Sequence, residues 1–240
     1  MICGFNCVGF DKFNSAHYEE NQNDCRLKDF IVNQKIDAKS LQENIFPIKP
    51  ADIFISHSHK DENIACNLKS WLEEKLKLTS FLDSDVWGSA DTILKQIDNS
   101  DFVSHYVKDK GGTTYSYEDR NLTTSYVHVM LCNAIMQAFD SCKFVFFINT
   151  PNSINAKASV EDKETNSPWI FYELGVLKYI RKKEVDLNKS FSLKEQKSLE
   201  NFINFPTSDL TNLPKLTYEK LNSLNNTDVV SELLKLGNVI

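Results

Sequence analysis

The chain has 240 residues, enough for one domain with appendages, and 41% of them are hydrophobic, so a buried core is expected. Its 27 basic and 33 acidic side chains give a formal net charge of −6. This balance argues against a nucleic-acid partner, because neutralising phosphates requires clustered cations. The densest apolar run, Phe144–Ile148, is far shorter than the roughly 20 residues that cross a bilayer. We therefore expect no membrane partner either.

The six cysteines include no CxxC pair, and their spacing matches no zinc pattern. The N-terminal residues have no basic stretch followed by an apolar run, which a secretory signal would need. We expect a cytoplasmic protein with free thiols and no metal site.

Residues 1–50 are interpreted as an N-terminal helical arm. Leu27, Phe30, Ile31 and Ile36 give a short stripe at helical spacing, and Pro47 then interrupts the chain. The arm is expected to pack on the region that follows it.

From Ala51 the pattern predicts alternating strands and helices. Residues 52–56 are a short apolar run typical of a buried parallel strand, and a helix capped by Asp61 follows through Lys77. A second strand is expected at 79–83, a break at Gly88 and Ser89, and a helix at 91–98. This order predicts an α/β fold with a parallel sheet flanked by helices.

The second half of the chain continues the pattern after an insertion. Residues 100–120 lack the periodicity of a core element and predict an exposed insertion, followed by a helix at 127–139 and a strand at 143–148. Ser167 and Pro168 predict the start of a helix that runs to about 183. Short helices are expected near 192–203 and 228–236. The predicted division is an arm at 1–50, a domain at 51–183 with an insertion at about 100–141, and a C-terminal helical extension at 184–240.

Ligands of open parallel sheets bind at the carboxyl ends of the strands. The candidate ligand-binding segments are therefore the loops 56–59, 83–88 and 150–153, together with the first turns of the helix at Trp169. Trp169 and Glu173 are four residues apart and share one helical face, at the edge of an apolar stripe. A carboxylate there is partly desolvated, as a catalytic group requires. A solvated rim charge is the alternative. No GxGxxG, P-loop or GxSxG motif is present.

Three segments together resemble bacterial Toll/interleukin-1 receptor (TIR) domains. Residues 52–61, DIFISHSHKD, resemble the first family box, and 81–89, FLDSDVWGS, resemble the second strand and its mobile loop. Residues 167–174, SPWIFYEL, resemble the helix in which an aromatic residue precedes the catalytic glutamate by four. The resemblance covers about 51–183 and implies a flavodoxin-like sheet.

The resemblance implies cleavage or cyclisation of NAD at the nicotinamide–ribose bond, with Glu173 as the catalytic residue. One carboxylate suffices because nicotinamide leaves without protonation, whereas glycosidases must also protonate an oxygen. The anion would stabilise an oxocarbenium-like ribose. The expected substrate-binding residues are Trp169, Ser56, His57, Asp83, Asp85, Trp87 and Asn152. NAD is the substrate, and no further cofactor is expected.

The resemblance also implies self-association through TIR–TIR contacts and a role in anti-phage defence. The product would be ADP-ribose or a cyclic or modified form of it, sensed by a downstream effector. The insertion between Phe102 and Asn121 would shape this product, or it would serve oligomer contacts. Two other functions stay open: a non-catalytic TIR adaptor that only assembles, and an enzyme that processes free nucleosides.

Overall fold

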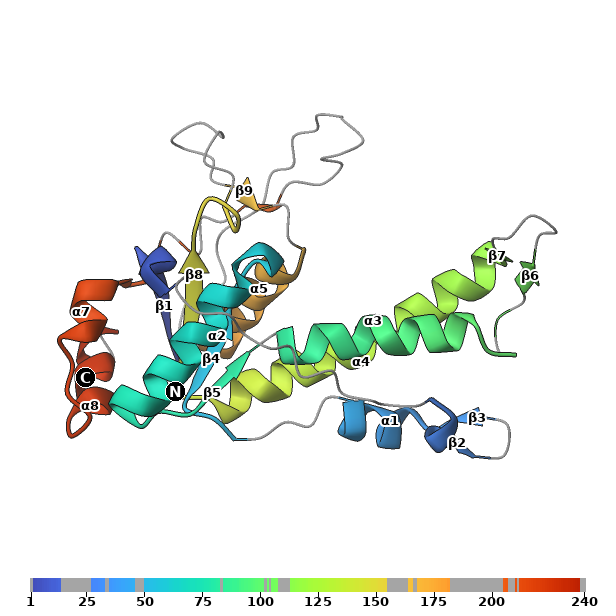
Figure 1. Ribbon diagram of the computed structural model, residues 1–240, viewed down its shortest axis with the longest axis horizontal. Helices are drawn as coiled ribbons and strands as arrows, with labels where there is room; N and C mark the ends of the chain where they lie inside the picture. The colour runs from blue at the N-terminus through green and yellow to red at the C-terminus, as the bar shows by residue number, and fades with distance from the viewer. Residues whose placement is uncertain are drawn as a thin grey trace. The chain divides into compact units, whose positions relative to one another are not determined.

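The structure is a computed structural model that describes residues 2–13, 27–32, 35–45, 50–82, 84–101, 103, 105–107, 113–154, 164–165, 168–181, 205–206, 210 and 212–237. The chain forms two compact units, whose elements are labelled in Figure 1. The sheet unit contains Met1–Tyr18, Ala51–Leu82 and Phe139–Ile240, and the hairpin unit contains Glu19–Pro50 and Asp83–Ala138.

The sheet unit is built on five parallel strands in the order β11-β1-β8-β4-β5. Their bounds are β1 Cys3–Val8, β4 Ile53–Ser56, β5 Ser80–Leu82, β8 Phe144–Asn149 and β11 Lys215–Thr217. Every residue of β4 is buried, as are the first five of β8. Burial on both faces explains why these strands are continuous apolar runs rather than alternating ones.

One face of the sheet holds the largest hydrophobic cluster. Phe5, Ile55 and Phe146 pack there with side chains of η1 (Phe10–Phe13), α2 (Glu62–Trp71) and α8 (Val229–Leu236). Helix α2 continues as a π-helical turn, η4 (Leu72–Leu76), and ends at Lys77, which has a left-handed φ of 57°.

The opposite face is covered by α5 (Pro168–Arg181) and by the end of α4 (Tyr117–Ser141). The ring centroids of Phe139 on α4 and Phe54 on β4 are 4.4 Å apart. Gly4 on β1 lies under α5, since a Cβ built on it would overlap the Leu177 side chain. The missing side chain at Gly4 therefore sets how closely α5 approaches the sheet.

The hydrophobic pattern correctly predicted β4, β5, β8, α2, α5 and α8, with small shifts of their bounds. The α/β class and the parallel sheet flanked by helices are confirmed. The helices expected near 192–203 and the Ser167 cap lie outside the described residues.

The interpretation of the two ends of the chain is wrong where they enter the sheet. Residues 3–8, predicted to belong to a helical arm, form the inner strand β1, and residues 215–217 of the expected helical extension form the edge strand β11. Among the described residues of the expected arm, the helical elements are η1, η2 (Leu27–Phe30) and α1 (Ala38–Ile45). Helices do occur in the extension, at α7 (Tyr218–Asn222) and α8.

The strand order is compatible with a flavodoxin-like sheet. If β4 is counted as the first strand, β5-β4-β8 reproduces the 2-1-3 part of the flavodoxin order 2-1-3-4-5. The fourth and fifth positions are filled by β1 and β11. The N-terminal strand thus takes an inner place that the sequence pattern assigned to no strand.

The hairpin unit contains α1, the long helix α3 (Ser84–Asp98), most of α4, and two antiparallel pairs of short strands. The strands are β2 (Ile31–Val32) with β3 (Lys35–Ile36), and β6 (His105–Val107) with β7 (Thr113–Tyr115). The expected break at Gly88 and Ser89 is wrong, because both lie inside α3.

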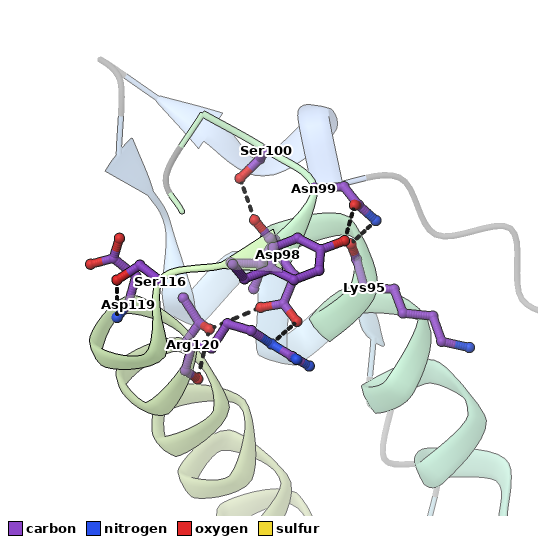
Figure 2. A network of polar contacts seen from close by, with 10 residues as sticks. Lys95, Asp98, Asn99, Ser100, Ser116, Asp119 and Arg120 are labelled. Carbon is purple, nitrogen blue, oxygen red and sulfur yellow. Dashed lines mark hydrogen bonds and ion pairs between the residues drawn. The ribbon is translucent and has the colours of Figure 1, made fainter. Parts of the chain in front are cut away.

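The insertion at 100–120 also differs from the expected loop, since it contains the hairpin β6–β7 and the first turn of α4. Figure 2 shows the polar network that joins these elements. Arg120 Nε lies 2.9 Å from the buried carboxylate of Asp98, and the Tyr115 hydroxyl donates to Asn99 Oδ1 at 2.6 Å. The Arg120 guanidinium also lies 5.1 Å from the centre of the Tyr115 ring. These contacts fix the end of α3 to the start of α4.

The remaining short elements are η3 (His59–Asp61), β9 (Glu164–Thr165) and β10 (Phe205–Pro206). Within the described ranges, no helix combines the length and the apolar character needed to span a membrane.

Candidate functional site

The polar residues of interest lie where β4 and β8 end, at the switch point of the sheet. From β4 the chain continues through α2 to β5 on one side, whereas from β8 it continues through α5 and ends at β11 on the other. α2 and α5 also cover opposite faces. In open α/β sheets, ligands bind outside the carboxyl ends of the strands at this position.

Glu173 of α5 is joined to Ser56, the last residue of β4. The Ser56 hydroxyl donates to Glu173 Oε2 at 2.5 Å, and the two residues are 1% and 0% exposed. A hydrogen bond to an ionised carboxylate is stronger than a neutral one. Leu177 follows Glu173 by one helical turn and packs over Gly4. The face of α5 that contacts the sheet therefore also directs Glu173 toward the end of β4.

A second buried carboxylate connects the loops that follow β4 and β8. Asp61, 1% exposed, accepts from Thr150 Oγ1 at 2.5 Å and from Asn152 Nδ2 at 2.7 Å. Asp61 stands at the N-cap position of α2, but its side chain makes no capping bond. The sequence pattern predicted that Asp61 caps the helix. In the structure its carboxylate instead accepts hydrogen bonds from the loop after β8.

The loop itself is closed by Ser153. Its hydroxyl accepts from the Thr150 backbone N–H and donates to the Thr150 carbonyl, both at 3.0 Å. The backbone N–H of Asn152 donates to Thr150 Oγ1 at 3.1 Å. The turn is thus determined locally, and Asp61 fixes it to the start of α2.

An asparagine pair lies on the same face of the sheet as Glu173. Asn6 and Ser56 are both paired in register with Phe147 of β8, so all three point to one face. Asn149, two residues farther along β8, donates to Asn6 Oδ1 at 2.9 Å. The α5 face of the carboxyl edge is therefore lined by amide, hydroxyl and carboxylate groups.

The structure unites some of the residues expected at the site. It places Ser56 against Glu173 and Asn152 against Asp61, and His57 follows Ser56 as a buried residue. Trp169 is half-buried in the first turn of α5, four residues before Glu173.

The expected loop after the second strand is not a loop in the structure. Asp85 and Trp87 belong to α3 in the hairpin unit, and Asp83 lies outside the described residues. Glu173 belongs to the sheet unit. The segment was interpreted as mobile because of Gly88, but a single glycine inside a helix costs only about 1 kcal/mol and does not end it.

Sequence reasoning did not assign a site role to Asp61, Thr150, Asn6 or Asn149. The signal for Thr150 was its place directly after a buried strand. Asp61 is the last residue of the motif at 52–61, but its hydrogen-bond partner Thr150 lies 89 residues farther along the chain. Asn6 had no signal, because the strand that carries it was not recognised.

The cysteines that the structure describes lie at least partly inside the fold. Cys3, Cys7, Cys66 and Cys142 are buried thiols, and Cys132 is a partly buried one. Burial raises the pKa of Cys7 well above its usual value and raises the pKa of Cys142 to about 11. Both thiols are thus protonated at neutral pH and are poor nucleophiles. Among the residues that the structure describes, no group of three His, Cys, Asp or Glu side chains is placed to hold a metal ion.

No family model, curated protein or solved structure matches this chain. What the site can do chemically follows from its residues and their geometry. This geometry offers one fully buried carboxylate, oriented by a serine, at the edge of the sheet where ligands bind. Such a group can stabilise a cation that develops beside it.

Proposed function

We propose that this protein is a NAD-cleaving enzyme of the TIR type, with Glu173 as the catalytic residue. The observation that carries the proposal is the position of Glu173: fully buried at the switch point of a parallel sheet and hydrogen-bonded to Ser56. Glutamate side chains are rarely fully buried, and those that are usually have a paired partner or a function.

The proposed reaction breaks the bond between the ribose and the nicotinamide nitrogen. The bonding electrons go to the ring, so nicotinamide leaves neutral without taking up a proton, and the ribose becomes oxocarbenium-like. The Glu173 carboxylate lies beside the developing charge and stabilises it. Water then attacks to give ADP-ribose and one proton. If a nitrogen of the bound adenine attacks instead, a cyclic product forms and the same proton is released.

Other residues of the site support this role in the proposal. Ser56 orients Glu173, and Trp169 walls the ribose from water. His57 and Asn152 are assigned to substrate binding, as are Asp83, Asp85 and Trp87. Assembly through TIR–TIR contacts, a cyclic signal for a downstream effector and a cytoplasmic role in anti-phage defence complete the proposal.

One observation favours the alternative of a non-catalytic adaptor. Glu173 has no exposed surface, so NAD reaches it only after neighbouring residues move. A buried carboxylate that accepts a hydrogen bond from Ser56 also stabilises the fold without any catalysis. The adaptor therefore predicts the same contacts and no turnover.

Incubating the purified protein with NAD and measuring nicotinamide and the ribosyl products by mass spectrometry separates the two functions. Glu173→Gln keeps the shape of the side chain but removes its charge, so nicotinamide release should stop. The matched control is Glu74→Gln, an exposed glutamate of the same unit, which should keep full turnover. Thermal melting verifies that both variants fold.

Absence of nicotinamide at every protein concentration would support the adaptor, and turnover of a free nucleoside would support the third function. Near wild-type turnover in Glu173→Gln would remove this residue from the mechanism.

A further inference from the structure

Helix α4 exposes a row of large apolar side chains to solvent. Leu122 is 52% exposed, Tyr126 58%, Val129 59% and Met136 44%. The opposite side of the same helix is buried, for example at Val127, Leu131 and Ile135. The helix is therefore apolar on two sides, and its own fold covers only one of them. A solvated helix normally places polar residues on its outer side.

The spacing of the exposed row is that of a coiled-coil seam. Together with the exposed Asn133, the row runs 122, 126, 129, 133, 136, in steps of four and three. We call these five residues the α4 stripe. Alternating steps of four and three keep a row of side chains facing a partner helix, and a single Asn within such a seam is a known means of setting register.

The surroundings of the α4 stripe carry no formal charge. Between Arg120 and Asp140 the helix contains no Asp, Glu, Lys or Arg. Its other exposed positions there are neutral polar residues, including Asn121, Ser125 and Gln137, together with His128. Depletion of charge with Tyr and Met present is the composition of a buried interface rather than of a solvated face.

These features identify the partner as a helix of the same kind. A neutral surface offers no charge complementarity to an acidic or basic partner, whereas a heptad seam is complementary to another copy of itself. From Leu122 to Met136 the α4 stripe extends about 21 Å. A contact of that length is short, and it belongs with transient rather than with obligate interfaces.

We propose that the α4 stripe is a self-association surface on which α4 of a second copy of this chain docks. It belongs to the hairpin unit and does not depend on the proposed NAD chemistry.

The test compares two charge insertions on neighbouring residues of α4. Val129→Glu places a carboxylate in the centre of the stripe, whereas His128→Glu places the same charge on an exposed position about a third of a turn away. Light scattering after gel filtration, over a dilution series, gives the dimer dissociation constant of each. Wild type and His128→Glu should dimerise with similar constants, and Val129→Glu should dimerise at least tenfold more weakly.

A wild type that stays monomeric at all concentrations, or equal dissociation constants for the two variants, would overturn the proposal. Thermal melting of dilute, monomeric samples is the second measurement. Because Val129 is exposed in one chain, Val129→Glu should melt with wild type there. A clear loss of stability in the dilute sample would mean that another segment of the same chain covers the stripe, and it would also overturn the proposal.

Discussion

At the residue scale, the contact between Ser56 and Glu173 links the fold to the proposed chemistry. The two residues are 117 positions apart in the sequence, and the hydrogen bond forms only because α5 lies across the carboxyl end of β4. Ser56 touches Glu173 and acts through it, so we assign Ser56 as a positioning residue.

Ser56→Ala should lower kcat by about 10- to 100-fold and change KM little, because Glu173 loses the group that orients it. A buried carboxylate that loses a hydrogen-bond donor also binds a proton more readily. The acidic limb of the kcat profile should therefore move to higher pH. Steady-state kinetics of nicotinamide release across pH measures both effects. Ser56→Thr, which keeps the hydroxyl, is the control, and an unmoved profile in Ser56→Ala would argue against positioning.

The Asp61 cluster makes a separate prediction about stability. Thr150→Val keeps the shape of the side chain but removes the hydroxyl that donates to Asp61 and accepts from the Asn152 backbone. Removing the donor to the buried carboxylate of Asp61 should reduce the free energy of unfolding by about 1–3 kcal/mol. Urea denaturation measures the loss. Thr150→Ser retains the hydroxyl and should lose much less; equal losses would show that the methyl group, not the hydrogen bonds, carries the effect.

At the element scale, the sequence predicted those strands whose apolar runs are continuous and missed those whose runs are interrupted. Residues 144–148 have five apolar side chains in succession, and β8 was predicted correctly. β1 contains Gly4 and Asn6, which weaken strand propensity. Both residues have tertiary roles, under α5 and beside Asn149. β11 has one buried residue, Leu216, so its pattern carries almost no signal.

In the candidate site, too, the sequence predicted the features that depend on a local pattern and missed those that do not. Each motif by itself predicted where its own residues lie, Ser56 at the end of a strand and Trp169 and Glu173 on a helix, since strand ends and helical spacing are local properties. The pairing of Asp61 with Thr150 depends on which strands are neighbours in the sheet, and local patterns do not contain that information. The insertion was interpreted as a loop because strands β6 and β7 have three residues each. Its effect on the product stays a prediction.

Gly4→Ala tests whether the approach of α5 to β1 is as close as the structure has it. The added methyl would overlap the buried Leu177 side chain, so one of them must shift. We expect a loss of about 1–3 kcal/mol in the free energy of unfolding, as for other overpacked cores. Leu177→Val shortens the opposing side chain and should recover part of this loss in the double variant. Strictly additive losses in this double-mutant cycle would contradict the contact.

The amino-terminal edge of the sheet should make the protein sensitive to acid through Asp52. Partial burial by itself raises the pKa of Asp52, but hydrogen bonds from Lys143 and Thr79 outweigh it, and the pKa lies below its usual value. A lowered pKa in the folded state stabilises the fold above the unfolded pKa of about 3.9. This contribution is lost as the pH falls through the folded pKa.

Asp52→Asn should therefore reduce the free energy of unfolding by about 1 kcal/mol at neutral pH. At acidic pH, once the wild-type carboxyl is also protonated, the difference should nearly vanish. Urea denaturation at both pH values measures it. Asp91→Asn, at an exposed carboxylate of α3, is the control and should follow wild type at both. A difference for Asp52→Asn that is constant with pH would show that charge is not the cause.

At the scale of the whole molecule, two properties connect the proposed activity with self-association. Glu173, the catalytic residue of the proposed function, has no exposed surface in one chain, and the hairpin unit carries the α4 stripe, which is uncharged. If a minor, open form of the sheet unit binds NAD, any partner contact that favours this form raises the competent fraction. Self-association then becomes a way to control activity, and dilution should switch the enzyme off.

The specific activity for nicotinamide release should therefore rise with protein concentration, measured over roughly two orders of magnitude around the dimer dissociation constant. Val129→Glu, which leaves every proposed site residue unchanged, should keep the low specific activity of dilute wild type throughout this range. His128→Glu should follow wild type. Comparing the activity curve with the light-scattering curve of the same samples tests the coupling directly. A specific activity that stays constant while wild type dimerises would separate assembly from catalysis, and it would require that the movement exposing Glu173 occurs within a single chain.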